Sequence, residues 1–215
     1  MSLTLLTSGT TKEPKTVIHS WDYVEKCIQR SVKEIELTRN DVVLDVFPAN
    51  TIAHYTITAM PAYRAGAQLV SAKFEAIDYL QRFDQCRPTY IALIPRHWEI
   101  LKEHAEWNSM DLSCVRYMVT GSGPVPQAMI DDFLNKGVKT VANWYGMTEM
   151  PPPVFVGYNT ETFDFKSNGY TVEFTDEGEC VLDGFHTGDL FDVVTKKFLM
   201  RKNLPSNTKT WKNSQ

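Results

Sequence analysis

Residues 5–15 read Leu-Leu-Thr-Ser-Gly-Thr-Thr-Lys-Glu-Pro-Lys, an apolar start followed by a loop of hydroxyls, one glycine and two lysines. Glycine lets a backbone approach phosphate closely, hydroxyls donate hydrogen bonds, and lysine supplies positive charge. Apolar residues at 3–7 predict a strand, and apolar residues at helical spacing after residue 20 predict a helix. The stretch therefore predicts a polyphosphate loop between a strand and a helix. The alternative is a polar turn that only caps the helix.

The loop is not a Walker motif. Counting from Gly9, the pattern Gly, four residues, Gly, Lys, Ser or Thr would need a glycine where Pro14 stands. Proline has no N–H to offer a phosphate and cannot adopt a positive φ. A P-loop kinase or GTPase is therefore disfavoured.

Outward from this loop, strands and helices alternate. Further strands are expected at residues 41–47, 68–71, 90–94, 115–120 and 140–143. Helices are expected at residues 21–35, 52–65, 77–83, 97–106 and 126–135. This rhythm predicts an α/β fold, an open and mostly parallel sheet covered by helices. Ligands of such sheets bind at the carboxyl ends of the strands, where the glycine-rich loops fall.

A run of three prolines at 151–153 and repeated glycines after it mark a change of pattern. They predict a small, turn-rich antiparallel β region after the parallel sheet. The expected domains are an α/β core at 1–150, a β-rich segment at 151–202 and a polar C-terminal tail at 203–215.

Composition excludes several classes. The chain has 215 residues, of which 43% are hydrophobic, so an intrinsically disordered protein is excluded. Its 22 Lys and Arg residues against 26 Asp and Glu residues give a net charge of −4. The acidic balance argues against nucleic acid as the main partner. The sequence has no run of about 18 apolar residues, so no membrane-spanning helix is predicted. Four cysteines without a CxxC pair argue against zinc. With no secretory signal at the start, the cytoplasm is the expected compartment.

The opening stretch resembles the phosphate-binding signature of the AMP-forming adenylating enzymes, which include acyl-CoA synthetases, luciferases and the adenylation domains of peptide synthetases. That signature reads Thr-Ser-Gly-Thr-Thr-Gly, one variable residue, then Pro-Lys; here Lys12 replaces the last glycine. Lys12 adds a charge and removes a flexible position, so it can strengthen phosphate binding or block loop closure. The resemblance implies nucleotide binding by Thr7, Ser8, Gly9, Thr10, Thr11 and Lys15.

Residues 143–149, Asn-Trp-Tyr-Gly-Met-Thr-Glu, resemble the family's Tyr-Gly-x-Thr-Glu motif. The resemblance implies that Tyr145 stacks on adenine and that Gly146 belongs to the same nucleotide site. It implies catalytic roles for Thr148, at the α-phosphate, and Glu149, at Mg²⁺. A carboxylate beside phosphates suits magnesium. Considered alone, such a motif is more often core aromatics and a solvated acid than a nucleotide site.

Two more segments follow in family order. Residues 121–126 resemble the small-residue loop of the adenine pocket, which assigns nucleotide contacts to Gly121, Ser122 and Gly123; a plain strand-to-helix turn is the alternative.

Residues 185–190 contain Thr-Gly-Asp, from which Asp189 would accept hydrogen bonds from ribose hydroxyls; a turn aspartate is the alternative. Arg201 stands where the family has a ribose-contacting arginine. His54 follows a proline-containing turn, as does a family residue that faces the acyl substrate; a core histidine is the alternative. The remaining histidines considered, His19, His97 and His104, have no partner pattern and are expected to be structural.

The resemblance implies an enzyme that binds ATP and Mg²⁺ and activates a small carboxylic acid as an acyl-adenylate, with CoA as an acceptor. Lys15 would stabilise charge on phosphate oxygens. The 1–150 segment is then the nucleotide-binding core, and 151–202 completes its site.

Three family features are missing from the sequence: a long region before the loop, the full stretch between Glu149 and Thr187, and a C-terminal domain bearing a catalytic lysine. The available Lys202, Lys209 and Lys212 lie in no copy of that domain. Hence a second hypothesis stands beside the ligase: a nucleotide-binding module without full catalytic apparatus. A homodimer or a partner chain could supply the missing regions.

Overall fold

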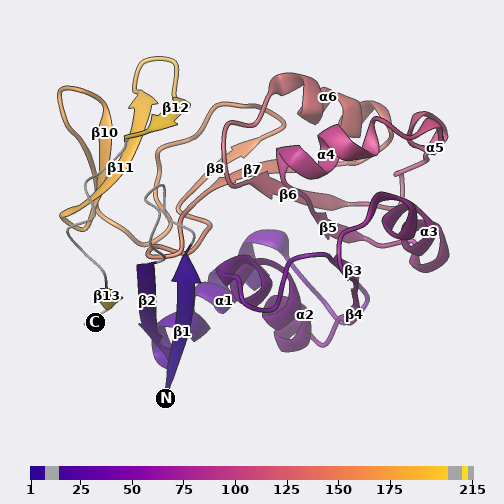
Figure 1. Cartoon of the computed structure of the whole chain (residues 1–215), viewed down its shortest axis with the longest axis horizontal. Coiled ribbons are helices and arrows are strands. Elements are labelled where there is room, and N and C mark those ends of the chain that lie inside the picture. The colour runs from indigo at the N-terminus through magenta and orange to yellow at the C-terminus, as the bar shows by residue number, and fades with distance from the viewer. Residues whose placement is uncertain (8–14, 203–209, 213–215) are drawn as a thin grey trace.

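The computed structural model describes residues 1–7, 15–202 and 210–212, and Figure 1 shows a central sheet between helices with a smaller sheet beside it. The six strands of the central sheet are, in spatial order, β4 (Gln68–Ser71), β3 (Val42–Asp45), β5 (Tyr90–Ala92), β6 (Tyr117–Gly121), β7 (Val141–Tyr145) and β8 (Phe155–Tyr158). All neighbours are parallel except β7 and β8. The predicted open, mostly parallel α/β sheet is confirmed.

Helices cover both faces of this sheet. One face carries α1 (Trp21–Ile35) and α2 (Ala59–Ala65), which lie below the sheet in Figure 1. The opposite face carries α3 (Ala76–Cys86), α4 (Pro95–Leu101), α5 (Ala105–Ser109) and α6 (Gln127–Asn135).

Strand β5 shows why both faces are apolar. Tyr90 and Ala92 pack into the core on the α1 side, while Ile91 between them packs on the α3 side. Successive side chains of a strand point to opposite faces, so a strand buried on both sides must be apolar throughout. Hence 90–94 reads as a continuous apolar run rather than an alternating one.

The predicted antiparallel region is also present. Its four strands are, in spatial order, β12 (Lys197–Arg201), β11 (Phe185–Asp192), β10 (Glu179–Leu182) and β9 (Val172–Phe174). An aromatic cluster joins it to the central sheet: the Phe191 ring of β11 lies edge-on to Phe155 of β8 at 6.0 Å and to Tyr145 of β7 at 5.0 Å. Strand β8 lies past residue 150 but continues the central sheet.

The loop at the start of the chain has a different setting from the one expected. Lys15–Ser20 is a strand, β2, which pairs antiparallel with β1 (Ser2–Thr7), so the prediction of a strand-to-helix junction is wrong. The burial of Val17 and His19, with half-buried residues between them, is strand periodicity, and the helix α1 begins only after Ser20. A third strand, β13 (Thr210–Lys212), runs parallel to β2 within the predicted tail.

The helix expected at 52–65 is divided. A π-helical turn, η1 (His54–Thr58), precedes α2. Pro61 has no N–H, so it cannot bond the Ile57 carbonyl as a helix requires; the Tyr90 hydroxyl donates to that carbonyl instead, at 2.9 Å. The helix expected at 97–106 is likewise two short helices, α4 and α5, of which the first begins at Pro95.

Among the described residues, no helix is both long and apolar enough to cross a membrane.

Candidate functional site

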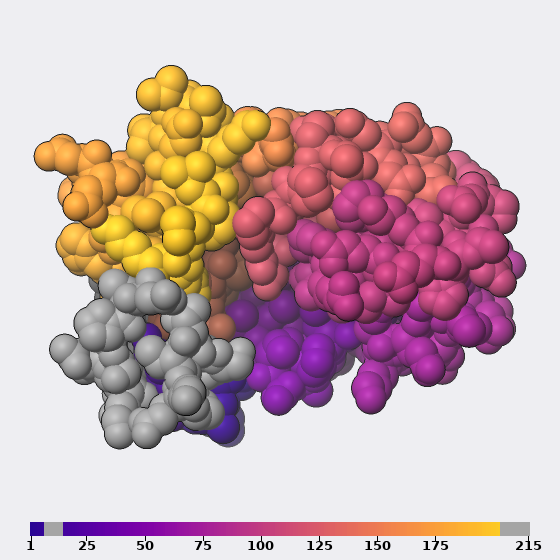
Figure 2. All heavy atoms as spheres, turned by 45° about the horizontal axis from the view of Figure 1, so that its top comes forward, coloured from indigo at the N-terminus to yellow at the C-terminus, as the bar shows by residue number. Residues whose placement is uncertain are grey.

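A cavity of about 1100 Å³ lies where the two larger sheets meet. Figure 2 shows the molecule hollowed between the yellow strands of the antiparallel sheet and the pink part of the central unit. The carboxyl ends of β5, β6 and β7 form one wall, and β11 and β12 form the opposite wall. This is the edge at which parallel sheets bind ligands.

Ten predicted site residues line this one cavity, although they come from five separate segments. They are Lys15, Gly121, Ser122, Gly123, Tyr145, Gly146, Thr148, Glu149, Asp189 and Arg201. Of the other predictions, Ser8, Gly9, Thr10 and Thr11 lie outside the described residues, and Thr7 ends β1.

The glycines of this wall are required by close backbone approach. A Cβ on Gly121 would lie 2.3 Å from the Trp144 carbonyl oxygen, and one on Gly146 would lie 2.6 Å from the Pro152 nitrogen. Ser122, between Gly121 and Gly123, has a φ of 68°, a conformation that an L-residue adopts at a cost in free energy. The small-residue loops therefore shape the cavity wall through the backbone.

Tyr145, Asp189 and Arg201 form one hydrogen-bonded network. Arg201 lies opposite Asp189 in the β11–β12 register and donates through Nε to Oδ1 at 2.6 Å and through Nη2 to Oδ2 at 2.7 Å. The Tyr145 hydroxyl donates to Oδ2 at 2.7 Å. Burial and the Asp189 charge raise the pKa of this phenol, so it stays protonated at neutral pH.

This network limits what Asp189 can still bind. A carboxylate has about four acceptor positions, and three donors already use positions on Asp189, which is 1% exposed. The remaining position is on Oδ1. The Tyr145 ring is covered on one face by Phe155, whose ring is nearly parallel at 5.3 Å. Phe191 also lies edge-on to Tyr145 at 5.0 Å, and Tyr145 is only 6% exposed. The predicted contacts to ribose and adenine thus remain predictions, and Asp189 has one acceptor position left for a ribose hydroxyl.

Sequence reasoning missed the role of His19. It is fully buried on β2, and its Nε2 donates to the Thr148 carbonyl at 2.7 Å. Burial lowers the pKa of His19, so the ring is neutral at pH 7. This bond fixes the Thr148–Glu149 turn to the strand that begins at Lys15. The alternation at 15–20 was the signal, because it places His19 on the buried face together with Val17.

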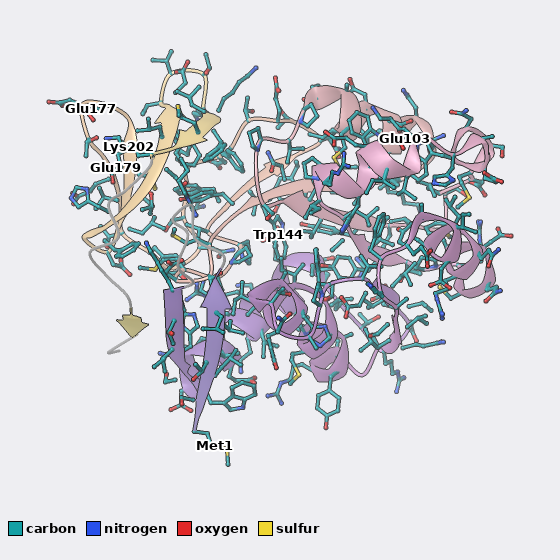
Figure 3. All side chains as sticks on the ribbon, viewed as in Figure 1. Met1, Glu103, Trp144, Glu177, Glu179 and Lys202 are labelled. Carbon is teal, nitrogen blue, oxygen red and sulfur yellow. The ribbon has the colours of Figure 1, made fainter. Side chains whose placement is uncertain are left out.

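Lys202 and His54 are both held by carboxylates. Lys202 lines the cavity, and its Nζ donates to Glu177 at 2.6 Å and Glu179 at 3.3 Å; Figure 3 shows the three together at the antiparallel sheet.

His54 Nδ1 bonds the buried Asp45 at 2.8 Å, and His54 is not among the described residues that line the cavity. Its predicted contact with an acyl substrate stays untested.

The described residues contain no group of three or more His, Cys, Asp or Glu side chains that could hold a metal ion. Glu149 is a single carboxylate on the cavity wall. That set fits Mg²⁺, which is commonly bound by one or two carboxylates together with substrate phosphates. It does not fit a metal held by protein ligands alone.

Comparison with known proteins gives consistent results. The family model described as AMP-binding enzyme matches residues 2–177. Indoleacetate–CoA ligase of Aromatoleum aromaticum is 33% identical over 147 residues, covering 68% of this chain and 29% of that protein. 4-Coumarate–CoA ligase 3 of Arabidopsis thaliana is 30% identical over 168 residues, covering 74% and 30% respectively.

Solved structures share the fold. The inhibitor-bound N-terminal domain of FACL13 from Mycobacterium tuberculosis superposes with a TM-score of 0.78 at 20% identity, covering 92% of this chain and 60% of that one. O-succinylbenzoate CoA synthetase from Bacillus subtilis, in complex with ATP and magnesium ion, gives 0.75 at 19% identity, covering 92% and 49%. The chain spans about a third or less of the length of the curated relatives it matches.

Proposed function

The chain belongs to the AMP-binding enzyme family, and from this membership we propose that it binds ATP and activates a carboxylic acid as an acyl-adenylate. The observation that carries the proposal is the convergence of ten predicted site residues, from separate segments, on one cavity. Unrelated turns and caps would have no reason to share a wall.

In the proposed reaction, a carboxylate oxygen of the acid bonds to the α-phosphorus of ATP while the bond to the departing pyrophosphate breaks. The Lys15 ammonium offsets negative charge on the phosphate oxygens, and the Thr148 hydroxyl donates a hydrogen bond to them. Glu149 would hold Mg²⁺, which supplies further positive charge to the same oxygens. No enzyme nucleophile is needed. The sulfur of CoA then bonds to the acyl carbon while the bond from that carbon to the AMP oxygen breaks, and AMP and the thiol proton are released.

ATP–pyrophosphate exchange with a broad panel of carboxylic acids tests this proposal. We expect exchange that requires an added acid and falls at least about tenfold in Glu149→Gln, because the metal contributes several kcal/mol. Glu103→Gln is the matched control, since Glu103 is exposed and lies far from Glu179 and Lys202 in Figure 3. An absence of exchange with every acid would refute the ligase.

A second function has support from the separate partners of Lys202 and Asp189. Lys202 is already bound to two carboxylates, and Asp189 has one acceptor position left. We propose as the alternative a nucleotide-binding module that depends on a partner chain or a second copy for catalysis. Calorimetric binding of ATP or AMP without exchange would favour it. If neither nucleotide binds, both functions are refuted.

We also propose the cytoplasm as the compartment. All four cysteines, Cys27, Cys86, Cys114 and Cys180, are free thiols, as is usual where the environment is reducing. Cell fractionation with an antibody against the protein tests this.

A further inference from the structure

The cavity has an apolar compartment beside its phosphate-facing half. Its walls come from the segment between β3 and η1, from η1 itself, and from the ends of β5, β6 and β7. The apolar residues are Phe47, Ile52, Ala53, Ile57, Leu93, Ile94, Val119 and Trp144. An acid whose carboxylate reaches the phosphate-facing half would place the rest of its structure here.

Core residues close the floor of this compartment. Ile57, Val119 and Trp144 belong to the hydrophobic core between the sheet and α1, and Trp144 is only 3% exposed. Leu93 belongs to the core on the other side of the sheet. A long chain could extend past them only by opening a packed core, which is unfavourable. The compartment therefore suits a compact group such as a ring.

One wall carries a polar side chain, His97 of α4. Its imidazole stacks on Phe74 with ring centroids 3.9 Å apart and planes 15° apart, and it lies 6.3 Å from the Phe47 ring. Burial lowers the pKa of His97 to about 4. At neutral pH the ring is therefore uncharged and has one N–H donor.

The tautomer follows from the neighbouring backbone. The Ile94 N–H donates to Nδ1 at 3.5 Å, so the proton of the neutral ring is on Nε2. Within the described part of the chain, Nε2 has no hydrogen-bond partner, and His97 lines the cavity. The same lining also contains the polar residues Asn50, Thr51 and Thr120, and His97 adds an imidazole donor from α4.

We propose that the acyl compartment takes an aryl carboxylic acid with a hydrogen-bond acceptor on its ring, and that the Nε2–H of His97 recognises this acceptor. The inference rests on the proposed acid-activating function and adds the class of acid. A ligand without the acceptor would displace water from Nε2–H and leave that donor unpaired, which lowers its affinity. A site with a buried polar group discriminates more strongly than a purely apolar one.

The test compares acids of equal length that differ in one acceptor. The probes are 3- and 4-methoxybenzoate, 3- and 4-ethylbenzoate, and octanoate as the alkyl acid. Their dissociation constants are measured by calorimetry without ATP. We expect one methoxy acid to bind about 3- to 10-fold more tightly than its ethyl partner, the effect of one hydrogen bond, and octanoate to bind more weakly than both.

His97→Phe keeps a ring against Phe74 but removes the donor, so it should abolish the methoxy preference while ethylbenzoate binding changes little. His97→Gln restores a donor and should recover part of the preference. His104→Phe is the histidine control, since His104 lies outside the cavity lining, and it should keep the wild-type ratio.

The inference is overturned if neither methoxy acid is preferred, if His97→Phe keeps the preference, or if octanoate binds as tightly as the benzoates. Calorimetry with ATP on the same preparations separates this failure from that of the proposed function. ATP binding without an acid preference rejects only the role of His97. An acid preference without nucleotide binding rejects the ligase instead.

Discussion

The network around Asp189 permits a quantitative prediction. Arg201→Met removes the guanidinium but keeps most of the apolar stem, and leaves the Asp189 carboxylate, whose side chain is 2% exposed, with the Tyr145 hydroxyl as its remaining side-chain donor. Removing one partner of a buried ion pair costs about 3–5 kcal/mol. The Arg201 side chain is itself 42% exposed, so water replaces part of its interaction. We expect a loss of about 2–3 kcal/mol in the free energy of unfolding.

Urea unfolding followed by circular dichroism measures this loss, which corresponds to roughly 4–12 °C in melting temperature for a chain of this size. Arg96→Met is the matched control, because Arg96 and Glu99 form an ion pair with side chains 68% and 52% exposed. Its loss should stay within about 1 kcal/mol.

A double variant isolates the buried charge. Arg201→Met combined with Asp189→Asn leaves no unpaired carboxylate, so it should lose less stability than Arg201→Met alone. The reasoning is wrong if the double variant loses as much as the single one, or if Arg201→Met costs no more than Arg96→Met.

Three further changes have expected outcomes. Lys15→Ala should weaken ATP binding more than AMP binding by calorimetry, because Lys15 is proposed to face the outer phosphates; equal weakening, or the same effect in the exposed Lys26→Ala, would contradict that role. Burial acts to raise the pKa of Asp41, but hydrogen bonds from Arg116 and Thr89 lower it to about 2. The contribution of Asp41 to the free energy of unfolding is therefore complete above the unfolded pKa of 3.8 and is lost as the pH falls toward 2. Asp41→Asn should therefore be less stable by about 2 kcal/mol at pH 7 in urea unfolding, and a difference that stays constant down to pH 2 would disprove the linkage. His19→Leu should reduce the Mg²⁺-dependent part of ATP binding through the Thr148 turn, and His19→Gln should restore some of it; a loss of stability alone, with that part unchanged, would make His19 purely structural.

The central sheet could be predicted from the sequence because its strands are short apolar runs bounded by turn residues. Residues 90–94 and 115–120 each carry that signal within a few positions of chain. The same local information predicted the glycine-rich loops that shape the cavity, since glycine is needed wherever backbones approach closely.

The features that could not be predicted depend on distant partners. The π-helical turn before α2 reflects Pro61 together with the hydroxyl of Tyr90, which reaches it from another strand. His19 and His97 looked structural because their partners, Thr148 and Phe74, lie far away in the sequence or bear no motif. Likewise, Thr-Gly-Asp predicted a ribose contact for Asp189 but gave no sign that Tyr145 and Arg201 already occupy most of its acceptor positions.

The floor of the acyl compartment has an optical consequence. The chain has five tryptophans, and of the four with described side chains Trp144 lines the cavity. Trp98 and Trp107 lie elsewhere, with both indole N–H groups bound to Asp132 at 2.7 and 2.9 Å, so they supply a steady background emission. Quenching or a spectral shift of the Trp144 fluorescence would then report the arrival of a ring in the compartment. The protein thus contains an intrinsic probe with which stopped-flow kinetics can time ligand entry without any label.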